Sequence, residues 1–347
     1  MKKIIIFYFL IFLCIATCYA KRFNKVQQLS SSVKTITATL DGNKYFHRNG
    51  DISIAGVRYH DLYFFWIGEN VNYNNYNHIF AFSKEGKLIQ TISLPKNFDS
   101  SGQLFVRNDS LLIRNEYSDY PDYHICLIDT TWTITKINKL SRLIYEDADY
   151  RVFYKAMGEW GTYLHFVEKE TNVVHTYYGK ESRIIKHKDG YYLYGPYSVS
   201  YIHNPKEGII NSSNVLEVPE GNIPYSNSEK IIQFKKTNEE FYFFKSDSTI
   251  AAVTLVNNKI LAIINDKNEA FVAEINGKNI RQLYSIGSSF GSIYGTENFG
   301  RNISDSYSSC SFYRSKSQFG ILELEDDMVT IFKVNINYFN KKKSRRH

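Results

Sequence analysis

The most regular feature of the chain is a repeated pairing of an apolar run, a short polar turn and a second run with alternating apolar positions. In the clearest copy, residues 79–82 (IFAF) are followed by the turn 83–87 (SKEGK) and by residues 88–94 (LIQTISL). Four more copies begin at residues 125, 163, 270 and 319. Two runs of strand-forming residues joined by a short polar turn are typical of a β-hairpin.

The spacing of these hairpins indicates a repeat architecture. Most neighbouring copies begin about 40–50 residues apart, which is the period of propeller blades built from roughly four short strands. The interval between the copies at 163 and 270 is about twice as long, so we expect a degenerate copy near Val215 and Leu216. Six copies then predict a six-bladed β-propeller over residues 40–337.

Composition agrees with an all-β fold. The chain has 28 Tyr and 24 Phe but only 3 Met, and strands favour aromatic residues. Continuous apolar runs such as residues 62–66 and 241–244 fit strands that are buried on both faces. No apolar stripe with helical period extends over three turns. Two alternatives stay open, seven blades or two packed β-sandwich domains, because the copies between residues 180 and 260 are irregular.

The hairpin of residues 79–94 resembles the blades of secreted bacterial six-bladed propellers related to the NHL type. Those blades often contain an apolar strand, an Asp-x-x-Gly-Lys turn and a second strand. The resemblance implies a scaffold for binding. The abundance of Asn, Lys, Ile, Tyr and Phe is also similar to that of proteins from AT-rich bacterial genomes, including those of Bacteroidetes.

The N-terminus has the pattern of a signal peptide. Lys2 and Lys3 precede an apolar run over residues 4–16, and Cys18-Tyr19-Ala20 places small residues where signal peptidase cleaves. The expected organisation is a signal peptide at 1–20, a lead-in at 21–39, the propeller, and a disordered basic tail at 338–347. An acylated Cys18 or a retained anchor is the alternative, although the run is shorter than the ~18 apolar residues of a spanning helix.

The sequence indicates an extracytoplasmic protein with no spanning segment after cleavage. Only Cys126 and Cys310 remain in the mature chain, and whether they form a disulfide stays open. With 43% hydrophobic and 22% charged residues, the chain can bury a core and is not disordered as a whole.

Chemical motifs are scarce. The sequence has no Gly-x-Ser-x-Gly, His-Glu-x-x-His, phosphate-binding glycine loop or Cys-x-x-Cys, so catalytic residues stay unknown and no cofactor or metal is expected. The acidic run 146–149 (EDAD) offers oxygens of the kind that Ca²⁺ prefers, but it lacks the spacing of a calcium loop. A solvated loop between blades is the favoured interpretation of this run.

Tyrosines with Asn or Asp are concentrated in three stretches, residues 70–78, 117–123 and 191–197. A tyrosine offers a rigid flat face with a hydroxyl, and Asn or Asp adds paired hydrogen bonds, a combination that suits sugar rings or peptide backbones. Loops with a purely structural role are the alternative, because tyrosine is frequent throughout the chain. The candidate ligand-binding residues are Tyr73, Tyr76, Tyr117, Asp119, Tyr120 and Asp122.

These features favour a secreted, non-enzymatic binding or scaffold protein that recognises a glycan or a protein partner through its Tyr/Asn-rich loops. The alternative is a carbohydrate-active enzyme, a glycoside hydrolase or lyase with carboxylates at the mouth of the channel. Nucleic acid is not an expected partner, because these stretches lack the interleaved Arg or Lys of a single-strand binding site.

Cleavage after Ala20 can be tested directly. We expect the exported chain to begin at Lys21, because Ala20 is the last small residue after the apolar run. N-terminal sequencing and the intact mass of the exported protein measure this. An acylated Cys18 at the N-terminus, or a chain that still begins at Met1, would contradict the prediction.

Overall fold

The structure is a computed structural model, and it describes residues 33–46, 51–71, 74–94, 102–107, 109–115, 122–128, 130–138, 143–156, 162–178, 183–187, 190–195, 198–207, 209–210, 242–243, 248–276, 279–294 and 307–338. Its strands form six sheets, which we call blades 1 to 6 in chain order. The only helices in these segments are a four-residue helix, α2 (Gly42–Tyr45), and a single 3-10 turn, η2 (Pro205–Glu207).

Blades 1 to 3 account for the first half of the propeller. Their strands are β2 (Asp51–Tyr59), β3 (Leu62–Val71), β4 (Asn74–Ser83) and β5 (Leu88–Ser93) in blade 1; β6 (Gly102–Arg107), β7 (Ser110–Asn115), β8 (Asp122–Ile128) and β9 (Thr131–Ile137) in blade 2; and β10 (Leu143–Glu146), β11 (Tyr150–Ala156), β12 (Thr162–Glu168), β13 (Val174–Tyr178) and β17 (Ile209–Ile210) in blade 3.

Blades 4 to 6 complete the molecule. Their strands are β14 (Arg183–His187), β15 (Gly190–Tyr194), β16 (Ser198–Ile202) and β18 (Tyr242–Phe243) in blade 4; β19 (Thr249–Val256), β20 (Lys259–Asn265), β21 (Glu269–Asn276) and β22 (Asn279–Ser288) in blade 5; and β23 (Ser292–Tyr294), β24 (Tyr307–Ser315), β25 (Gln318–Glu325), β26 (Met328–Asn337) and β1 (Val33–Asp41) in blade 6.

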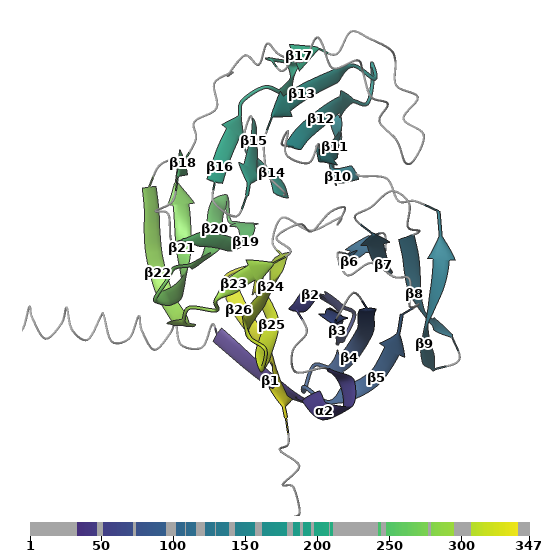
Figure 1. Cartoon of the computed structure of the whole chain (residues 1–347). Coiled ribbons are helices and arrows are strands. Elements are labelled where there is room, and N and C mark those ends of the chain that lie inside the picture. Colours follow the sequence, from purple (N-terminus) through teal and green to yellow (C-terminus); the bar gives the residue numbers. More distant parts are fainter. Residues whose placement is uncertain are drawn as a thin grey trace, which may run out of the picture.

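The six blades lie around a central axis (Figure 1). In each blade the first strand is nearest the centre and the following strands pair outward by antiparallel hydrogen bonding, as β2 to β5 do in blade 1. This arrangement is a six-bladed β-propeller. It confirms the all-β class and the blade number expected from the hairpin spacing, rather than seven blades or two β-sandwiches.

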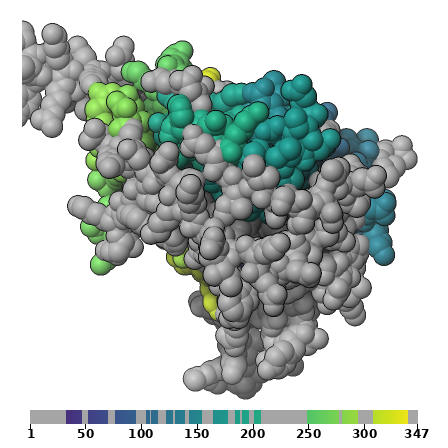
Figure 2. Space-filling model, turned by 90° about the horizontal axis from the view of Figure 1, so that it is seen from above, coloured from purple at the N-terminus to yellow at the C-terminus, as the bar shows by residue number. Residues whose placement is uncertain are grey.

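Blade 4 is interrupted between its third and fourth strands. After β16 the chain returns to blade 3, where η2 and β17 lie at the outer edge and β17 pairs with β13. Only β18 then completes blade 4, by pairing with β16. The degenerate copy expected near Val215 and Leu216 falls between β17 and β18, outside the described part of the chain. Figure 2 shows this rim of the ring, where blades 3 and 4 form one teal surface beside the green surface of blade 5.

The N-terminal strand β1 completes blade 6 in an unusual way. It pairs with β26 over nine residue pairs, from Val33 with Val329 to Asp41 with Asn337, and it is parallel to β26 whereas the other described strand pairs are antiparallel. Blade 6 already has four strands from the C-terminal end of the chain, so β1 is a fifth strand at its outer edge. The propeller therefore includes residues 33–39, which the sequence analysis places in the lead-in.

Large apolar side chains fill the spaces between neighbouring blades. At the junction of blades 6 and 1, Phe65, Phe319 and Phe332 are fully buried. The centre of the Phe65 ring lies 5.3 Å from that of Phe319 and 5.6 Å from that of Phe332. Each buried phenylalanine contributes about 1.5–3 kcal/mol relative to an exposed one. The continuous apolar runs in the sequence thus arise because a blade strand is buried on both faces.

The turn after β4 shows why a glycine is present in the clearest hairpin. Gly86 has a φ of +86°, and a Cβ atom there would lie 2.5 Å from the carbonyl oxygen of Thr37 in β1. A side chain at this position would be strained by the backbone conformation and would also collide with β1. The turn Ser83–Lys87 therefore closes its hairpin and allows blade 1 to approach the outer strand of blade 6.

A buried carboxylate links the same two blades. Glu323 of β25 is 1% exposed and accepts hydrogen bonds from Tyr63 (2.7 Å) and Tyr307, while Arg58 Nε lies 3.4 Å from it. Burial and the neighbouring Glu323 carboxylate raise the pKa of the Tyr63 hydroxyl, so Tyr63 stays a donor. For Arg58, burial favours the neutral form, but the interactions with Glu323, Tyr307 and Glu325 together outweigh it and raise the pKa.

Two smaller findings concern the membrane and the cysteines. In the part of the chain that the structure describes, no helix is long and apolar enough to cross a membrane. Cys126 lies in blade 2 and Cys310 in blade 6, and both are free thiols, so the two cysteines do not form a disulfide in this structure.

The Tyr63–Glu323 hydrogen bond gives a stability prediction. We expect Tyr63→Phe to lower the free energy of unfolding by about 1–3 kcal/mol, because it removes a charge-assisted bond to a buried carboxylate. Tyr284→Phe is the matched control: the Tyr284 hydroxyl also links two blades, but it donates to the neutral carbonyl of Asp327. We expect that control to lose less than about 1 kcal/mol. Urea denaturation measures both, and equal losses would contradict the prediction.

Candidate functional site

Two of the sequence-predicted site residues, Tyr76 and Asp122, lie in strands of blades 1 and 2. Asp122 is the first residue of β8, and Tyr76 lies in β4. Tyr73, Tyr117, Asp119 and Tyr120 lie outside the described residues.

The strand register of blade 1 places polar residues in one row across its three inner strands. Asp51 of β2 pairs with Asn70 of β3, and Asn70 pairs with Asn75 of β4. Residues 70–78 are therefore mainly the end of a regular hairpin and not a free loop. The register therefore places Asp51, Asn70 and Asn75 at the same level of blade 1, on neighbouring strands.

The neighbouring row contains Tyr76, opposite Glu69 in β3. Glu69 is 1% exposed, so a carboxylate is buried directly beside the predicted binding residue. Asn77, the next residue of β4, is also buried.

Asp122 has a different environment from an open ligand-binding carboxylate. Its side chain has no exposed surface, and Arg114, at the matching end of the adjacent strand β7, is also buried. The guanidinium of Arg114 lies over the ring of Phe105, 5.1 Å from its centre. Two buried charges of opposite sign therefore lie at this end of blade 2, and a binding role for Asp122 stays a prediction.

The third tyrosine-rich stretch is a strand. Residues 190–194 form β15, in which Tyr191 and Tyr194 are 3% and 2% exposed. Tyr191 packs with Phe166 between blades 3 and 4, and Tyr194 packs between blades 4 and 5. The interpretation of this stretch as a polar loop is wrong for these residues, because both faces of the strand are covered by neighbouring blades.

The acidic run of residues 146–149 is the turn between β10 and β11 within blade 3, and not the loop between blades that the sequence suggested. Asp147 accepts hydrogen bonds from the backbone N–H groups of Asp149 and Tyr150, and from the Tyr191 hydroxyl at 2.7 Å. Lys186 of blade 4 lies 3.1 Å from Asp147 and 2.8 Å from Asp149. The run is therefore a turn with bound partners and not only a solvated loop.

These bonds determine the ionisation of Asp147. Burial alone favours the neutral acid, but the hydrogen bonds from Tyr191 and the two backbone groups, with Lys186, outweigh it and lower the pKa. In the described residues, no group of three or more His, Cys, Asp or Glu side chains is arranged to hold a metal ion. The Asp147 carboxylate stays charged and joins two blades.

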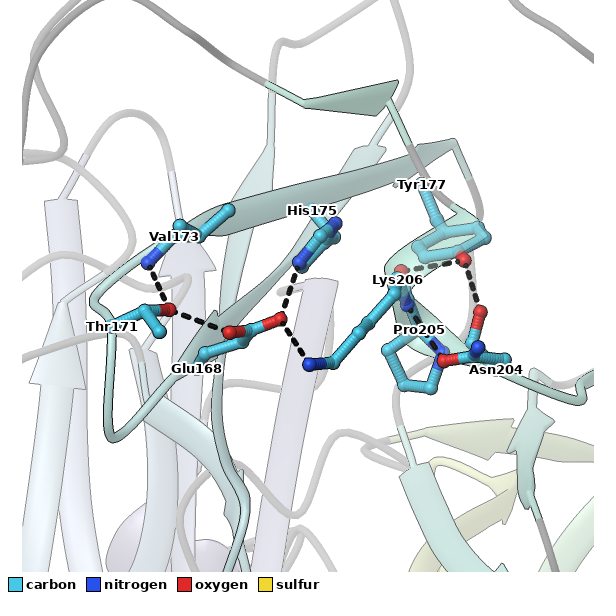
Figure 3. Close-up of polar contacts among 8 residues, drawn as sticks. All are labelled: Glu168, Thr171, Val173, His175, Tyr177, Asn204, Pro205 and Lys206. Carbon is cyan, nitrogen blue, oxygen red and sulfur yellow. Dashed lines mark hydrogen bonds and ion pairs between the residues drawn. The ribbon is translucent and has the colours of Figure 1, made fainter.

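A further polar cluster, which the sequence analysis did not find, lies at the outer hairpin of blade 3 (Figure 3). Glu168 ends β12, and its Oε1 atom is 3.0 Å from His175 Nε2 and 3.2 Å from Lys206 Nζ. Thr171, in the turn between them, donates its hydroxyl hydrogen to Glu168 Oε2. His175 and Glu168 are buried, whereas the Lys206 side chain is 61% exposed.

The chemistry of this cluster follows from the Glu168 carboxylate. The hydrogen bond from Thr171, with those from His175 and Lys206, outweighs burial and lowers the pKa of Glu168. An ionised carboxylate only accepts, so His175 carries its proton on Nε2 when it is neutral. His175 Nδ1 is buried and has no hydrogen-bond partner. His175 is thus held in one tautomer and orientation, but both of its ring nitrogens are covered.

The cluster anchors the segment that crosses from blade 4 to blade 3. Lys206 belongs to η2, and the Tyr177 hydroxyl of β13 lies 3.1 and 2.9 Å from the carbonyl oxygens of Asn204 and Pro205. His175 also pairs with Ile210 of β17 through the backbone. The Glu168 cluster is therefore built to hold this crossing in place.

The hairpin of residues 163–178 is visible in the sequence, but the contribution of Lys206 is not. Lys206 is 38 residues beyond Glu168 and enters only because blade 4 is interrupted. The sequence could have indicated part of this cluster, because Glu168 and His175 lie near the matching ends of the two strands of a predicted hairpin.

The comparisons with known proteins concern the fold. No family model matches the chain, and no curated protein matches it. Among solved structures, the β-propeller domain of the Trilobed protease from Pyrococcus furiosus matches with 12% identity and a TM-score of 0.32, over 82% of this chain and 83% of that one.

Two other solved structures match at a similar level. A structure from a study of two prolyl endopeptidases has 11% identity and a TM-score of 0.35, and the match covers 87% of this chain but 45% of that one. The WD40 domain of SCAP from fission yeast has 9% identity and a TM-score of 0.22, over 85% and 68% of the two chains. At these identities the likeness concerns the propeller fold alone.

The Glu168 cluster gives a pH-dependent prediction. We expect Glu168→Gln to lower the free energy of unfolding at pH 7 by about 1–2 kcal/mol, since it weakens hydrogen bonds to charged partners. The pKa of Glu168 is lowered in the folded state, so its contribution is complete above the ordinary carboxyl pKa and disappears as the pH falls through the folded-state value. The difference between wild type and variant should therefore shrink below about pH 4.

The control for this experiment is Glu170→Gln, an exposed carboxylate in the same turn. We expect it to change stability by less than about 0.5 kcal/mol at either pH. Urea denaturation at pH 7 and at pH 3.5 measures both variants. A loss in Glu168→Gln that is the same at both pH values would contradict the assignment.

Proposed function

We propose that this propeller is an extracytoplasmic, non-enzymatic recognition protein that binds a glycan at the ends of blades 1 and 2. Like the secreted bacterial propellers of the NHL type that it resembles, it would use the ring as a rigid support and its turns as the recognition surface. The residues assigned to binding are Tyr73, Tyr76, Tyr117, Asp119, Tyr120 and Asp122.

The observation that carries this proposal is the row Asp51, Asn70 and Asn75 across the three inner strands of blade 1. Amide and carboxylate groups spaced one strand apart, at ~4.8 Å, can engage successive hydroxyl groups of a sugar chain. Tyr73 and Tyr76 belong to the same hairpin and offer flat faces on which sugar rings can pack.

Three buried carboxylates elsewhere in the described structure connect parts of the ring to one another. Glu323, Asp147 and Glu168 each accept hydrogen bonds from tyrosine, threonine or histidine side chains and connect separate parts of the ring. A carboxylate with such partners holds its neighbours in place. This use of buried acids supports a scaffold for binding.

The enzymatic alternative requires two acids about 5–10 Å apart near the axis. The described innermost strands contain two acidic residues, Asp51 at the start of β2 and Glu146 at the end of β10. Each blade begins with its innermost strand, so these strands run in the same direction and the two acids belong to opposite mouths of the channel. Glu146 also pairs with Lys169 at 2.7 Å.

A glycan array tests the proposal. We expect the exported protein to bind one class of glycan, and Tyr73→Ala/Tyr76→Ala to reduce that binding about tenfold or more, because loss of a buried aromatic contact typically costs 1–2 kcal/mol or more. Asn75→Ala should also weaken binding. The matched control is Asn276→Ala, an exposed asparagine at the opposite end of blade 5, which should bind as the wild type does.

The same experiment separates the alternatives. A blank array would overturn glycan recognition and leave a protein as the partner to be sought. Cleavage of the bound glycan during incubation would overturn the non-enzymatic assignment.

A further inference from the structure

The six junctions between neighbouring blades differ in the side chains that hold them together. Buried apolar clusters with members from both blades join blades 6 and 1, 5 and 6, 1 and 2, 3 and 4, and 4 and 5. Among the residues that the structure describes, no apolar cluster has members from both blade 2 and blade 3. The junction of blades 2 and 3 is therefore the exception in the described part of the ring.

The alternation of side chains along each strand identifies the two faces that meet at this junction. In β7, Leu111 and Ile113 pack against blade 1, so Leu112 between them faces blade 3. In β12, Phe166 packs against blade 4, so its neighbour Val167 faces blade 2.

Both faces are covered, so the junction is closed in this structure. Phe105 and Leu112 of blade 2 are 1% and 7% exposed, and Phe153, Val167 and Val174 of blade 3 are also buried. The three blade 3 side chains form a small cluster of their own, to which neither Phe105 nor Leu112 belongs. The apolar side chains of the two blades are thus buried at the junction without sharing a core.

Charged and polar side chains occupy the same two faces. Arg114 of blade 2 is buried with its guanidinium 5.1 Å from the centre of the Phe105 ring, and Asp122 has no exposed surface. On the face of blade 3 towards blade 2, buried His165 lies opposite Thr176, and the two side chains are 2.9 Å apart. Charged and polar groups gain hydration when two faces separate, and this gain offsets part of the cost of exposing the apolar side chains.

We propose that the ring opens between blades 2 and 3, while the other five junctions stay closed. Separation of an apolar junction exposes its whole shared core to water, whereas separation here also hydrates Arg114, Asp122 and His165. Each blade keeps the hydrogen bonds of its own sheet, so the motion is a rigid-body displacement and not unfolding. The opening gives solvent and ligands a path from the side of the ring to the innermost strands β6 and β10. This inference goes beyond the proposed glycan recognition and does not depend on it.

Cysteines placed on the two faces of blade 3 measure the opening. Val167→Cys puts a thiol on the face towards blade 2, and the matched control Val152→Cys puts one on the face towards blade 4. Both valines are buried, at 3% and 0% exposed. In the native full-length protein, we expect maleimide to modify Val167→Cys about 100-fold faster than Val152→Cys, because one junction opens at a lower free energy than the whole fold. Peptide mapping reads each site, and Cys310, buried between blades 5 and 6, reports global unfolding.

A second pair of substitutions repeats the measurement from blade 2, and it keeps the test decisive if a substitution in blade 3 prevents folding. Leu112→Cys faces blade 3, and its control Leu111→Cys, the preceding residue of β7, faces blade 1. We expect Leu112→Cys to react faster than Leu111→Cys. Its rate should rise only weakly with urea, because the opening of one junction exposes much less surface than unfolding does.

Each outcome supports or overturns the opening. Fast modification of Val167→Cys and Leu112→Cys, with slow modification of both controls, supports it. Equal rates within each pair, matching the rate of Cys310, would show that the junction opens only when the whole protein unfolds, and would overturn it. Fast modification of Val152→Cys together with Val167→Cys would show that blade 3 unfolds as a unit, and would overturn it as well. No ligand enters the measurement, so its result is independent of the glycan array.

Discussion

The packing of blade against blade is the interaction on which the rest of the molecule depends. An antiparallel sheet alone has one dry and one wet face, but a ring lets each blade bury both faces against its neighbours. Phenylalanine and isoleucine fill these spaces, as Phe65 and Phe332 do between blades 1 and 6. The high aromatic content of the chain is a consequence of this geometry, since flat rings fill the wedge between two sheets.

Two of these junctions also contain a tyrosine that donates a hydrogen bond to a carboxylate across the junction. Tyr63 and Tyr191 occupy the same position, the second residue of the second strand, in blades 1 and 4, and each donates to a carboxylate of the preceding blade. A tyrosine reaches across the junction with its apolar ring in the core and its hydroxyl at the acid. These hydrogen bonds therefore link each pair of neighbouring blades through a carboxylate.

The local parts of this fold could be predicted from the sequence, and the long-range parts could not. Turns such as Ser83–Lys87 and the alternation around them are encoded within fifteen residues, and they identify the hairpins and the blade number. The parallel pairing of β1 with β26 joins residues about 300 positions apart. The crossing from blade 4 back to blade 3 depends on the outer edge of β13, with which β17 pairs. For the same reason His175 and Glu168 are in a recognisable hairpin, but Lys206 is not. Tyr191 and Tyr194 were misinterpreted because a tyrosine-rich strand buried on both sides has the same composition as a polar loop.

The pairing of β1 with β26 also sets the order in which the protein can be completed. Of the described strands, β1 is synthesised first and β26 last, so β1 cannot pair with β26 until residues 328–337 are available. Blades 1 to 5 can form their hairpins as they appear, because each is local in the sequence. The final step, however, brings together the two ends of the chain, a contact of the largest possible sequence separation and therefore a slow one. Until that step occurs, the nine residues of β1 are an unpaired strand, and a truncated or interrupted chain would carry this exposed edge permanently.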